Sequence, residues 1–197
     1  GMTKLVLDIR HNGGGLVSAA VAVADLFMDK GPVVTVKAGK QGNGETTVYN
    51  CSDKTPFRNL PLAVLVDEYS ASASEIFAGA IKDHGRGLIV GDNTYGKGSV
   101  QRTFTHGLGG FALKFTTAKF YSPSGHEIQG VGIAPDIKVE ENELDYNLLM
   151  LAYETRFVQK FLPEYSPDLS QLEIEGLDEI IDHTLERAQA ELAAKNP

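Results

Sequence analysis

Three alternating serines in the segment SASASE, residues 70–75, are the first side chains whose type and spacing could do chemistry. The segment joins an apolar run at 60–66 to a helical pattern at 72–84, so Ser72 is expected at a helix N-terminus. Unpaired backbone N–H groups at such a terminus can stabilise the oxyanion that forms when a serine hydroxyl attacks a carbonyl. Ser72 and Glu75 also match a capping box, which is the commoner role for a serine here, so both roles stay open.

A lysine in the glycine-rich segment GDNTYGKGS, residues 91–99, is the second candidate. The segment is similar to a phosphate-binding loop, but that loop has Ser or Thr directly after its lysine to hold magnesium, and here Gly98 follows Lys97. The next residues, 99–104, have the pattern of a strand, so no helix N-terminus is available to receive phosphates. Nucleotide binding is therefore disfavoured.

Lys97, Ser99 and Gln101 alternate in the sequence, so an extended segment would place their side chains on one face of a strand. A hydroxyl and an amide could then orient a lysine that acts as a general base. A lysine that accepts a proton near neutral pH needs a pKa well below the ordinary value of about 10.4, and burial away from carboxylates is the expected cause. A surface lysine in a glycine-rich loop is the alternative.

The segment DIRHNGGG, residues 8–15, is predicted to be a turn between a buried strand and a helix. Its glycines can expose backbone N–H groups toward a substrate carbonyl. The G-x-G-x-x-G spacing of a dinucleotide-binding turn is absent. Asp8 and Arg10 are expected to form an ion pair that braces the turn.

Composition favours one compact domain with a short appendage, because the chain has 197 residues of which 42% are hydrophobic. A net charge of −8 argues against a nucleic-acid surface. A single cysteine, Cys51, has no partner for an internal disulfide. The five histidines lack metal-ligand spacing, so no metal and no cofactor is expected, and none stands out as the partner of a catalytic serine.

Strands that are apolar at every position and alternate with helices predict an α/β fold whose sheet is covered on both faces. The residues after Gly98 change to alternating strands, and those from 141 onward are acidic and amphipathic, which predicts two helices split at 163–167. The segment 41–54 is expected to be a hairpin or a surface loop. The predicted strands are 4–9, 33–37, 60–66, 88–90, 99–104, 111–115 and 117–121, and the predicted helices are 16–28 and 72–84.

Over about residues 4–140, the order and spacing of these segments resemble the C-terminal processing peptidases, or tail-specific proteases, a family of serine endopeptidases with a Ser-Lys dyad. The shared motifs are DIRHNGGG at 8–15, SASE at 72–75, GKG at 96–98, and YSPSG at 121–125 leading to IQGVGIAPD at 128–136. Ser122 and His126 depart from the usual threonine and arginine of the last motif.

The resemblance implies that Ser72 is the nucleophile, that Lys97 is its general base and that Gln101 orients the lysine. The backbone N–H groups of Ala73 and of one glycine among residues 13–15, for which we choose Gly14, would form the oxyanion hole. The activity would be hydrolysis of peptide bonds near protein C-termini through an acyl-enzyme, with no cofactor.

The resemblance also implies an α/β fold like that of ClpP and the crotonases, a layered core of strands and helices with a C-terminal helical tail. Residues 1–140 would be the peptidase core, truncated at its N-terminus and without a PDZ domain, and residues 141–197 a C-terminal helical extension. Gly1 before Met2 is interpreted as a tag remnant. Substrates would be proteins or peptides and not nucleic acid, and the location would be extracytoplasmic, in the periplasm or envelope. Membrane association would run only through an absent N-terminal segment, and the oligomeric state is left open.

Two alternatives use the same fold. A non-catalytic binding module, similar to the retinoid-binding modules, is disfavoured because both Ser72 and Lys97 are retained. A crotonase-like acyl-CoA enzyme is disfavoured because serine, lysine and glutamine stand where that chemistry usually uses carboxylates.

Overall fold

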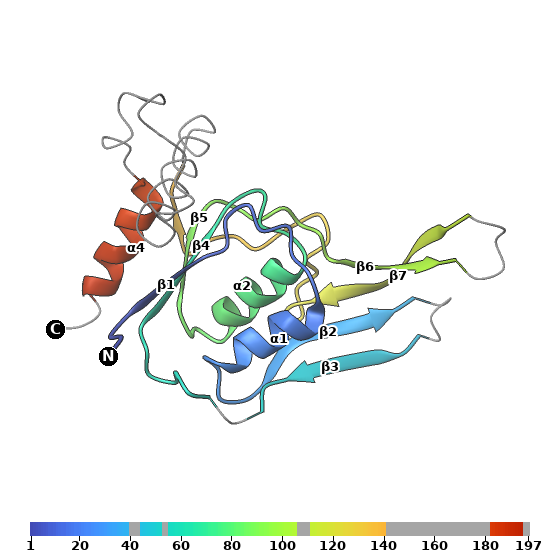
Figure 1. The fold of residues 1–197 in the computed structure, drawn as a ribbon, viewed down its shortest axis with the longest axis horizontal. Coiled ribbons are helices and arrows are strands. Elements are labelled where there is room, and N and C mark those ends of the chain that lie inside the picture. Colours follow the sequence, from blue (N-terminus) through green and yellow to red (C-terminus); the bar gives the residue numbers. More distant parts are fainter. Residues whose placement is uncertain (40–43, 53–54, 106–110, 141–181, 195–197) are drawn as a thin grey trace, which may run out of the picture.

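The computed structural model describes residues 1–39, 44–52, 55–105, 111–140 and 182–194, which form two four-stranded sheets and three helices (Figure 1). The first sheet is parallel, with strand order β1-β4-β5-β8. Its strands are β1 (Leu5–Asp8), β4 (Leu62–Val66), β5 (Leu88–Gly91) and β8 (Ile137–Lys138). The mixed α/β class predicted from the sequence is confirmed.

Helices cover both faces of the parallel sheet, which is why β4 is buried at all five of its positions. Alternate residues of β4 point to opposite faces: Leu62, Val64 and Val66 belong to the core under α1 (Val17–Asp25) and α2 (Ala73–Asp83). Ala63 and Leu65 instead pack against α4 (His183–Ala194). The sheet therefore lies between two helical layers, as the continuously apolar strands predicted.

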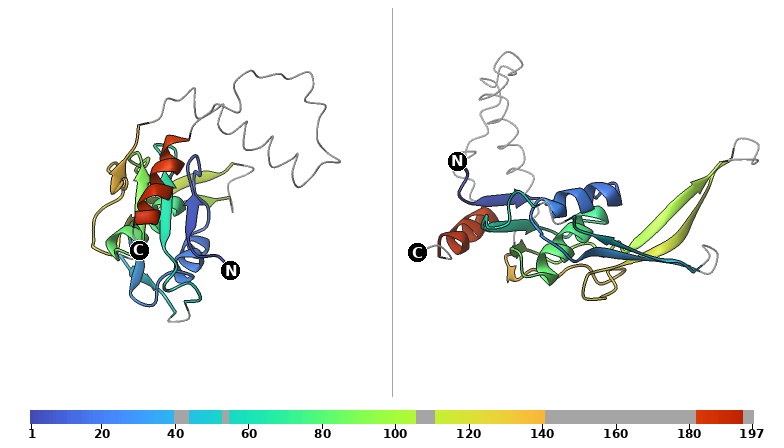
Figure 2. Two further views of the ribbon diagram at one scale, coloured as in Figure 1. Left: turned by 90° about the vertical axis from the view of Figure 1, so that its left-hand side faces the viewer. Right: turned by 90° about the horizontal axis from the view of Figure 1, so that it is seen from below.

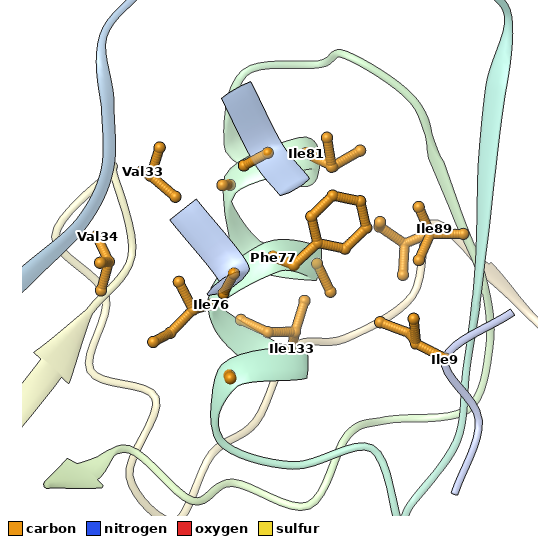
Figure 3. Close-up of a cluster of buried hydrophobic side chains, with 14 of the residues drawn as sticks. Ile9, Val33, Val34, Ile76, Phe77, Ile81, Ile89 and Ile133 are labelled. Atoms are coloured by element: carbon orange, nitrogen blue, oxygen red, sulfur yellow. The ribbon is translucent and has the colours of Figure 1, made fainter. Parts of the chain in front are cut away.

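The centre of the main core is α2, whose residues 73–81 are all buried. Figure 3 shows Phe77 and Ile81 of this helix between Ile89 and two residues of strand β2 (Pro32–Ala38), Val33 and Val34. Ile133, from the segment that follows the second sheet, packs into the same cluster. This packing fixes the N-terminus of α2, and Ser72 with it, against the sheet.

The second sheet is antiparallel, with strand order β3-β2-β7-β6, and it extends away from the helices (Figures 1 and 2). Its strands are β2 (Pro32–Ala38), β3 (Thr46–Asn50), β6 (Ser99–Phe104) and β7 (Leu113–Tyr121). Of the hairpin or surface loop expected over residues 41–54, the described part contains one arm of a hairpin, β3, whose partner strand is β2.

Most sequence-based boundaries differ from the structure by one or two residues, and two differences have a clear physical cause. The predicted strands 111–115 and 117–121 are one continuous strand, β7, because it pairs with β6 along its first part and with β2 along its last part. Helix α1 ends at Asp25, earlier than the predicted residue 28, because the backbone tightens into a turn in which Phe27 N–H and Met28 N–H both donate to Ala24 O.

The first of the two helices predicted after residue 141 lies outside the described residues, and within the region of the second, predicted after residue 167, the structure describes the helix α4. Among the residues that the structure describes, no helix combines the length and apolar character required to cross a bilayer.

Candidate active site

Ser72 occupies the N-cap of α2 in a backbone conformation that serine rarely adopts, with φ +58° and ψ −111°. In the described part of the chain only one other non-glycine residue, His11, has a positive φ. Such strain persists only where surrounding contacts enforce it, and it concentrates at functional sites. The half-buried Ser72 is thus held in a sharp strand-to-helix turn, which supports the predicted location at a helix N-terminus.

Glu75 holds the serine turn and the lysine loop together. Its Oε2 accepts hydrogen bonds from Ser72 N–H at 2.7 Å and from Lys97 N–H at 2.8 Å. Its Oε1 accepts from Gly96 N–H at 2.6 Å and from Thr94 Oγ1 at 2.7 Å. The side chain is fully buried, so these four donors replace the water that a carboxylate would otherwise need. The sequence predicted that Glu75 caps α2. The structure shows that Glu75 also links the serine turn to the loop that carries Lys97.

The glycine turn lies directly against Ser72. A Cβ placed on Gly14, whose φ is +97°, would lie 2.5 Å from Ala71 O, 2.7 Å from Ala73 N and 2.8 Å from Ser72 Cβ. Only glycine fits this approach and this backbone conformation. The structure therefore brings Gly14 beside Ser72 and Ala73, which lie about sixty positions later in the chain.

Asn12 fastens the glycine turn to the start of α2. Its backbone oxygen accepts hydrogen bonds from Ala71 N–H at 3.0 Å and from Ser74 Oγ at 2.9 Å. Its side-chain oxygen Oδ1 accepts Gly14 N–H at 2.9 Å, so the N–H group of Gly14 already has an acceptor. Within the described ranges, no acceptor is found for Ala73 N–H, and this donor remains available to a ligand.

Lys97 lies in the loop before β6, and its side chain is exposed. The predicted arrangement of Lys97, Ser99 and Gln101 on one strand face is wrong, because β6 begins at Ser99 and its register with β7 shifts between Val100 and Gln101. Gln101 is also exposed. The burial expected for a lysine base is not found, and among the described residues no hydrogen bond joins Lys97 Nζ to Ser72.

The IQGVGI segment, residues 128–133, supports the loop that carries Lys97. Gly130 N–H donates to Gly96 O at 2.8 Å, and Ile133 N–H donates to Thr94 Oγ1 at 2.7 Å. A Cβ on Gly98 would lie 2.3 Å from Gln129 N, so the two segments pack backbone to backbone. No role was predicted for this motif from the sequence. In the fold, it supports the loop that carries Lys97.

The ion pair expected between Arg10 and Asp8 is confirmed, with Nη2 2.7 Å from Oδ2. Asp182, far away in the sequence, also binds this guanidinium at 2.8 Å. Burial acts to lower the pKa of Arg10, but the hydrogen bonds to the two carboxylates outweigh it and raise the pKa. Sequence reasoning missed Asp182, because no local pattern links residues so far apart.

A hollow of about 340 Å³ opens beside the first turn of α2. Its lining is mostly apolar, and Ala73, Gly14 and Phe77 contribute to it together with residues of α1. It therefore lies beside Ala73, for whose N–H group the described ranges show no acceptor. An apolar side chain of a ligand whose carbonyl approaches Ser72 has space there.

Comparison with known proteins gives one consistent result. Residues 1–139 match the model of peptidase family S41. A carboxy-terminal-processing protease of Bartonella bacilliformis is 47% identical over 136 residues, which cover 69% of this chain and 31% of that protein. This chain thus spans about a third of the length of the curated relative.

Two solved structures share the fold. The photosystem II D1 C-terminal processing protease matches with a TM-score of 0.64 and 40% identity, covering 70% of this chain and 35% of that one. A putative S41 protease from Bacteroides fragilis matches with a TM-score of 0.65 and 15% identity, covering 99% of this chain and 46% of that one. The motif order, the convergence of the motifs around Ser72 and the family match over residues 1–139 agree, and the chain belongs to peptidase family S41.

Proposed function

We propose that this chain carries the site of a serine endopeptidase that hydrolyses peptide bonds near protein C-termini through an acyl-enzyme. The observation that carries the proposal is the joint at Glu75, whose buried carboxylate binds the backbone N–H groups of both Ser72 and Lys97. A merely structural helix cap requires only the first of these bonds. Residues 25 positions apart are held on one carboxylate at the point where two loops meet, as a nucleophile and its base require.

The reaction begins when neutral Lys97 Nζ removes the proton from Ser72 Oγ, which attacks the carbonyl carbon of the substrate peptide bond. The oxyanion that forms is stabilised by Ala73 N–H and by a backbone donor of residues 13–15. The lysine ammonium then protonates the leaving amine, and water hydrolyses the ester on Ser72 in a second round of the same proton transfers. From the family resemblance we also propose that Gln101, which is exposed in the free chain, orients the lysine side chain once that side chain has turned toward Ser72.

In this mechanism the side chain of Lys97 turns from solvent toward Ser72 Oγ, to a distance of about 3 Å. The backbone of Lys97 is already anchored through Glu75 and through Gly96, so we expect rotation of the side-chain torsions to make this change. Bound substrate would also exclude water from the lysine side chain. Catalytic hydrogen bonds often tighten only in the substrate complex, so the Lys97–Ser72 bond is expected to form there.

The substrates proposed from family membership are proteins or peptides, and the hollow beside Ala73 supports an apolar side chain next to the scissile bond. The family resemblance also leads us to propose an extracytoplasmic location. The net charge of −8 argues against a nucleic-acid partner.

Cleavage of an unfolded polypeptide tests the proposal. The chain is expected to shorten such a substrate from its C-terminal region, and Ser72→Ala is expected to abolish cleavage, while Ser18→Ala, at an exposed site on α1, keeps the wild-type rate. Mass spectrometry of the products locates the cleaved bonds. Equal cleavage by Ser72→Ala and wild type would refute the assignment, and absence of cleavage together with a co-purifying lipophilic ligand would favour the binding-module alternative.

A further inference from the structure

Arg10 is a buried cation at the start of the turn that lies against Ser72. Only 2% of its side chain is exposed. Its Nε and Nη2 bind Asp8, at distances between 2.7 and 3.2 Å. Its Nη1 and Nη2 bind the two carboxylate oxygens of Asp182 at 3.1 and 2.8 Å. A planar guanidinium held by two carboxylates has a fixed orientation.

Asp182 is separated from Arg10 by 172 positions and directly precedes α4. Its side chain is only 6% exposed. The same residue begins the helix, because Asp182 Oδ1 accepts Leu185 N–H at 2.8 Å and Asp182 O accepts Glu186 N–H at 2.9 Å. The carboxylate therefore binds both the helix that follows it and the cation of the glycine turn.

The docking of α4 on the parallel sheet determines where Asp182 lies. Ala188 and Leu192 of α4 are buried in one cluster with Ala63 and Leu65 of β4 and Val90 of β5. Figure 1 shows α4 beside β4 and β5, on the side of the sheet away from α1 and α2. The Arg10–Asp182 pair thus connects α4, on one face of the parallel sheet, to the turn at residues 11–15 that lies against Ser72.

The connection continues from Arg10 to the nucleophile in two short steps. Asn12, two residues after Arg10, accepts hydrogen bonds from Ala71 and Ser74 on either side of Ser72. Asn12 also orients Gly14, whose backbone lies so close to Ser72 and Ala73 that a Cβ on it would overlap both. A shift of the Arg10 side chain therefore changes the same turn that lines the oxyanion position.

We propose that Asp182 is a positioning residue, which holds the turn at residues 11–15 against Ser72 through Arg10, so that the docked C-terminal helix is a working part of the site. The effect on the turn follows from the contacts alone. Its effect on catalysis rests on the proposed peptidase function.

The test uses Asp182→Asn in the full chain. Asparagine keeps an oxygen that caps α4 but removes the charge that pairs with Arg10. We expect amide hydrogen exchange at residues 12–15 to become at least about tenfold faster, while residues 188–192 of α4 stay protected. Labelling of Ser72 by a phosphonate is expected to slow by about tenfold at saturating reagent, with little change in the concentration that half-saturates the rate.

Two further variants separate this role from a general loss of stability. Glu186→Gln removes one charge from the first turn of α4 without touching Arg10 and is expected to leave both measurements unchanged. Asp182→Glu keeps the charge and is expected to recover part of the labelling rate. Unchanged exchange at residues 12–15 in Asp182→Asn would overturn the proposal, as would equal loss of protection in the turn and in α4. If Ser72 of the wild-type chain is not labelled by the phosphonate, the peptidase proposal fails. Hydrogen exchange at residues 12–15 in Asp182→Asn still decides whether Asp182 positions the turn.

Discussion

The two halves of the site are built on opposite kinds of structure. The serine half lies at the covered parallel sheet, where β4 and α2 are buried and Ser72 is held in a strained backbone conformation. The lysine half leads into β6, an edge strand whose last four residues are all exposed. The proposed nucleophile, Ser72, is therefore fixed before substrate arrives, whereas for the proposed base, Lys97, only the main chain is fixed. The hydrogen bonds to Glu75 are what connect the two halves.

Gly14→Ala should have the largest effect, because its methyl group would lie 2.5 Å from Ala71 O in a backbone region that alanine avoids. The displaced serine turn is expected to lower peptide cleavage by more than about 100-fold. Gly13→Ala is the matched control, since it keeps the backbone N–H group and its methyl group would meet no atom within 4 Å. Steady-state cleavage of a fluorogenic peptide measures both, and equal activity would show that the close approach has no role.

Glu75→Gln should have the next largest effect. An amide of the same size cannot accept all four hydrogen bonds, and its NH₂ group would oppose a backbone donor. We expect a loss of about 2–3 kcal/mol in the free energy of unfolding. Activity should fall by about 100-fold at temperatures where the variant remains folded. Urea unfolding and peptide cleavage measure the two effects, with the exposed Glu68→Gln as control.

Phe77→Ala and Phe115→Ala compare the two regions through stability alone. Phe77 is 3% exposed at the centre of the core, so its truncation is expected to cost about 3–5 kcal/mol. Phe115 is 52% exposed on β7, so the same change there should cost less than about 0.5 kcal/mol. Denaturant unfolding monitored by circular dichroism gives both values, and similar losses would mean that the antiparallel arm is not the open structure described.

The smallest expected effect is the response of Asp83 to acid. Partial burial acts to raise its pKa, but hydrogen bonds from Ser122 and Ser124 and the nearby charge of His126 outweigh it and lower the pKa. A carboxyl whose pKa is lower in the folded state stabilises the fold above its ordinary value of 3.8, and this contribution is lost as the pH falls through the folded-state pKa. Melting temperatures between about pH 6 and 2 should therefore decline less steeply for Asp83→Asn than for wild type. Parallel curves would contradict this.

Local patterns were sufficient to predict much of the fold. The continuous apolar runs identified β4 and β5, and the helical spacing of Ile76, Phe77 and Ile81 identified α2. The predicted strand 99–104 matches β6, but the shared face expected for Lys97, Ser99 and Gln101 does not follow, because alternation does not reveal where pairing begins or where a bulge shifts the register.

Long-range contacts were beyond the reach of the sequence. The positive φ of Ser72 results from the contacts around it, and the capping-box pattern of Glu75 describes one of the four hydrogen bonds that it accepts. Asp182 carries no local signal that points to Arg10. Each of these features depends on contacts between residues that are far apart in the sequence, whereas periodicity shows only which residues share a face of one helix or strand.

The most direct test of the central claim is the rate at which a peptidyl phosphonate labels Ser72 in wild type and in Lys97→Ala, followed by intact mass and located by peptide mapping. A single label on Ser72 is predicted for wild type, with a rate that falls at least about 100-fold when the lysine is removed, because the serine then lacks its general base. Lys82→Ala, which removes a lysine that pairs with Asp136 and lies in the last turn of α2, at the opposite end of that helix from Ser72, should label at the wild-type rate. Equal labelling of Ser72 with and without Lys97 would contradict the account.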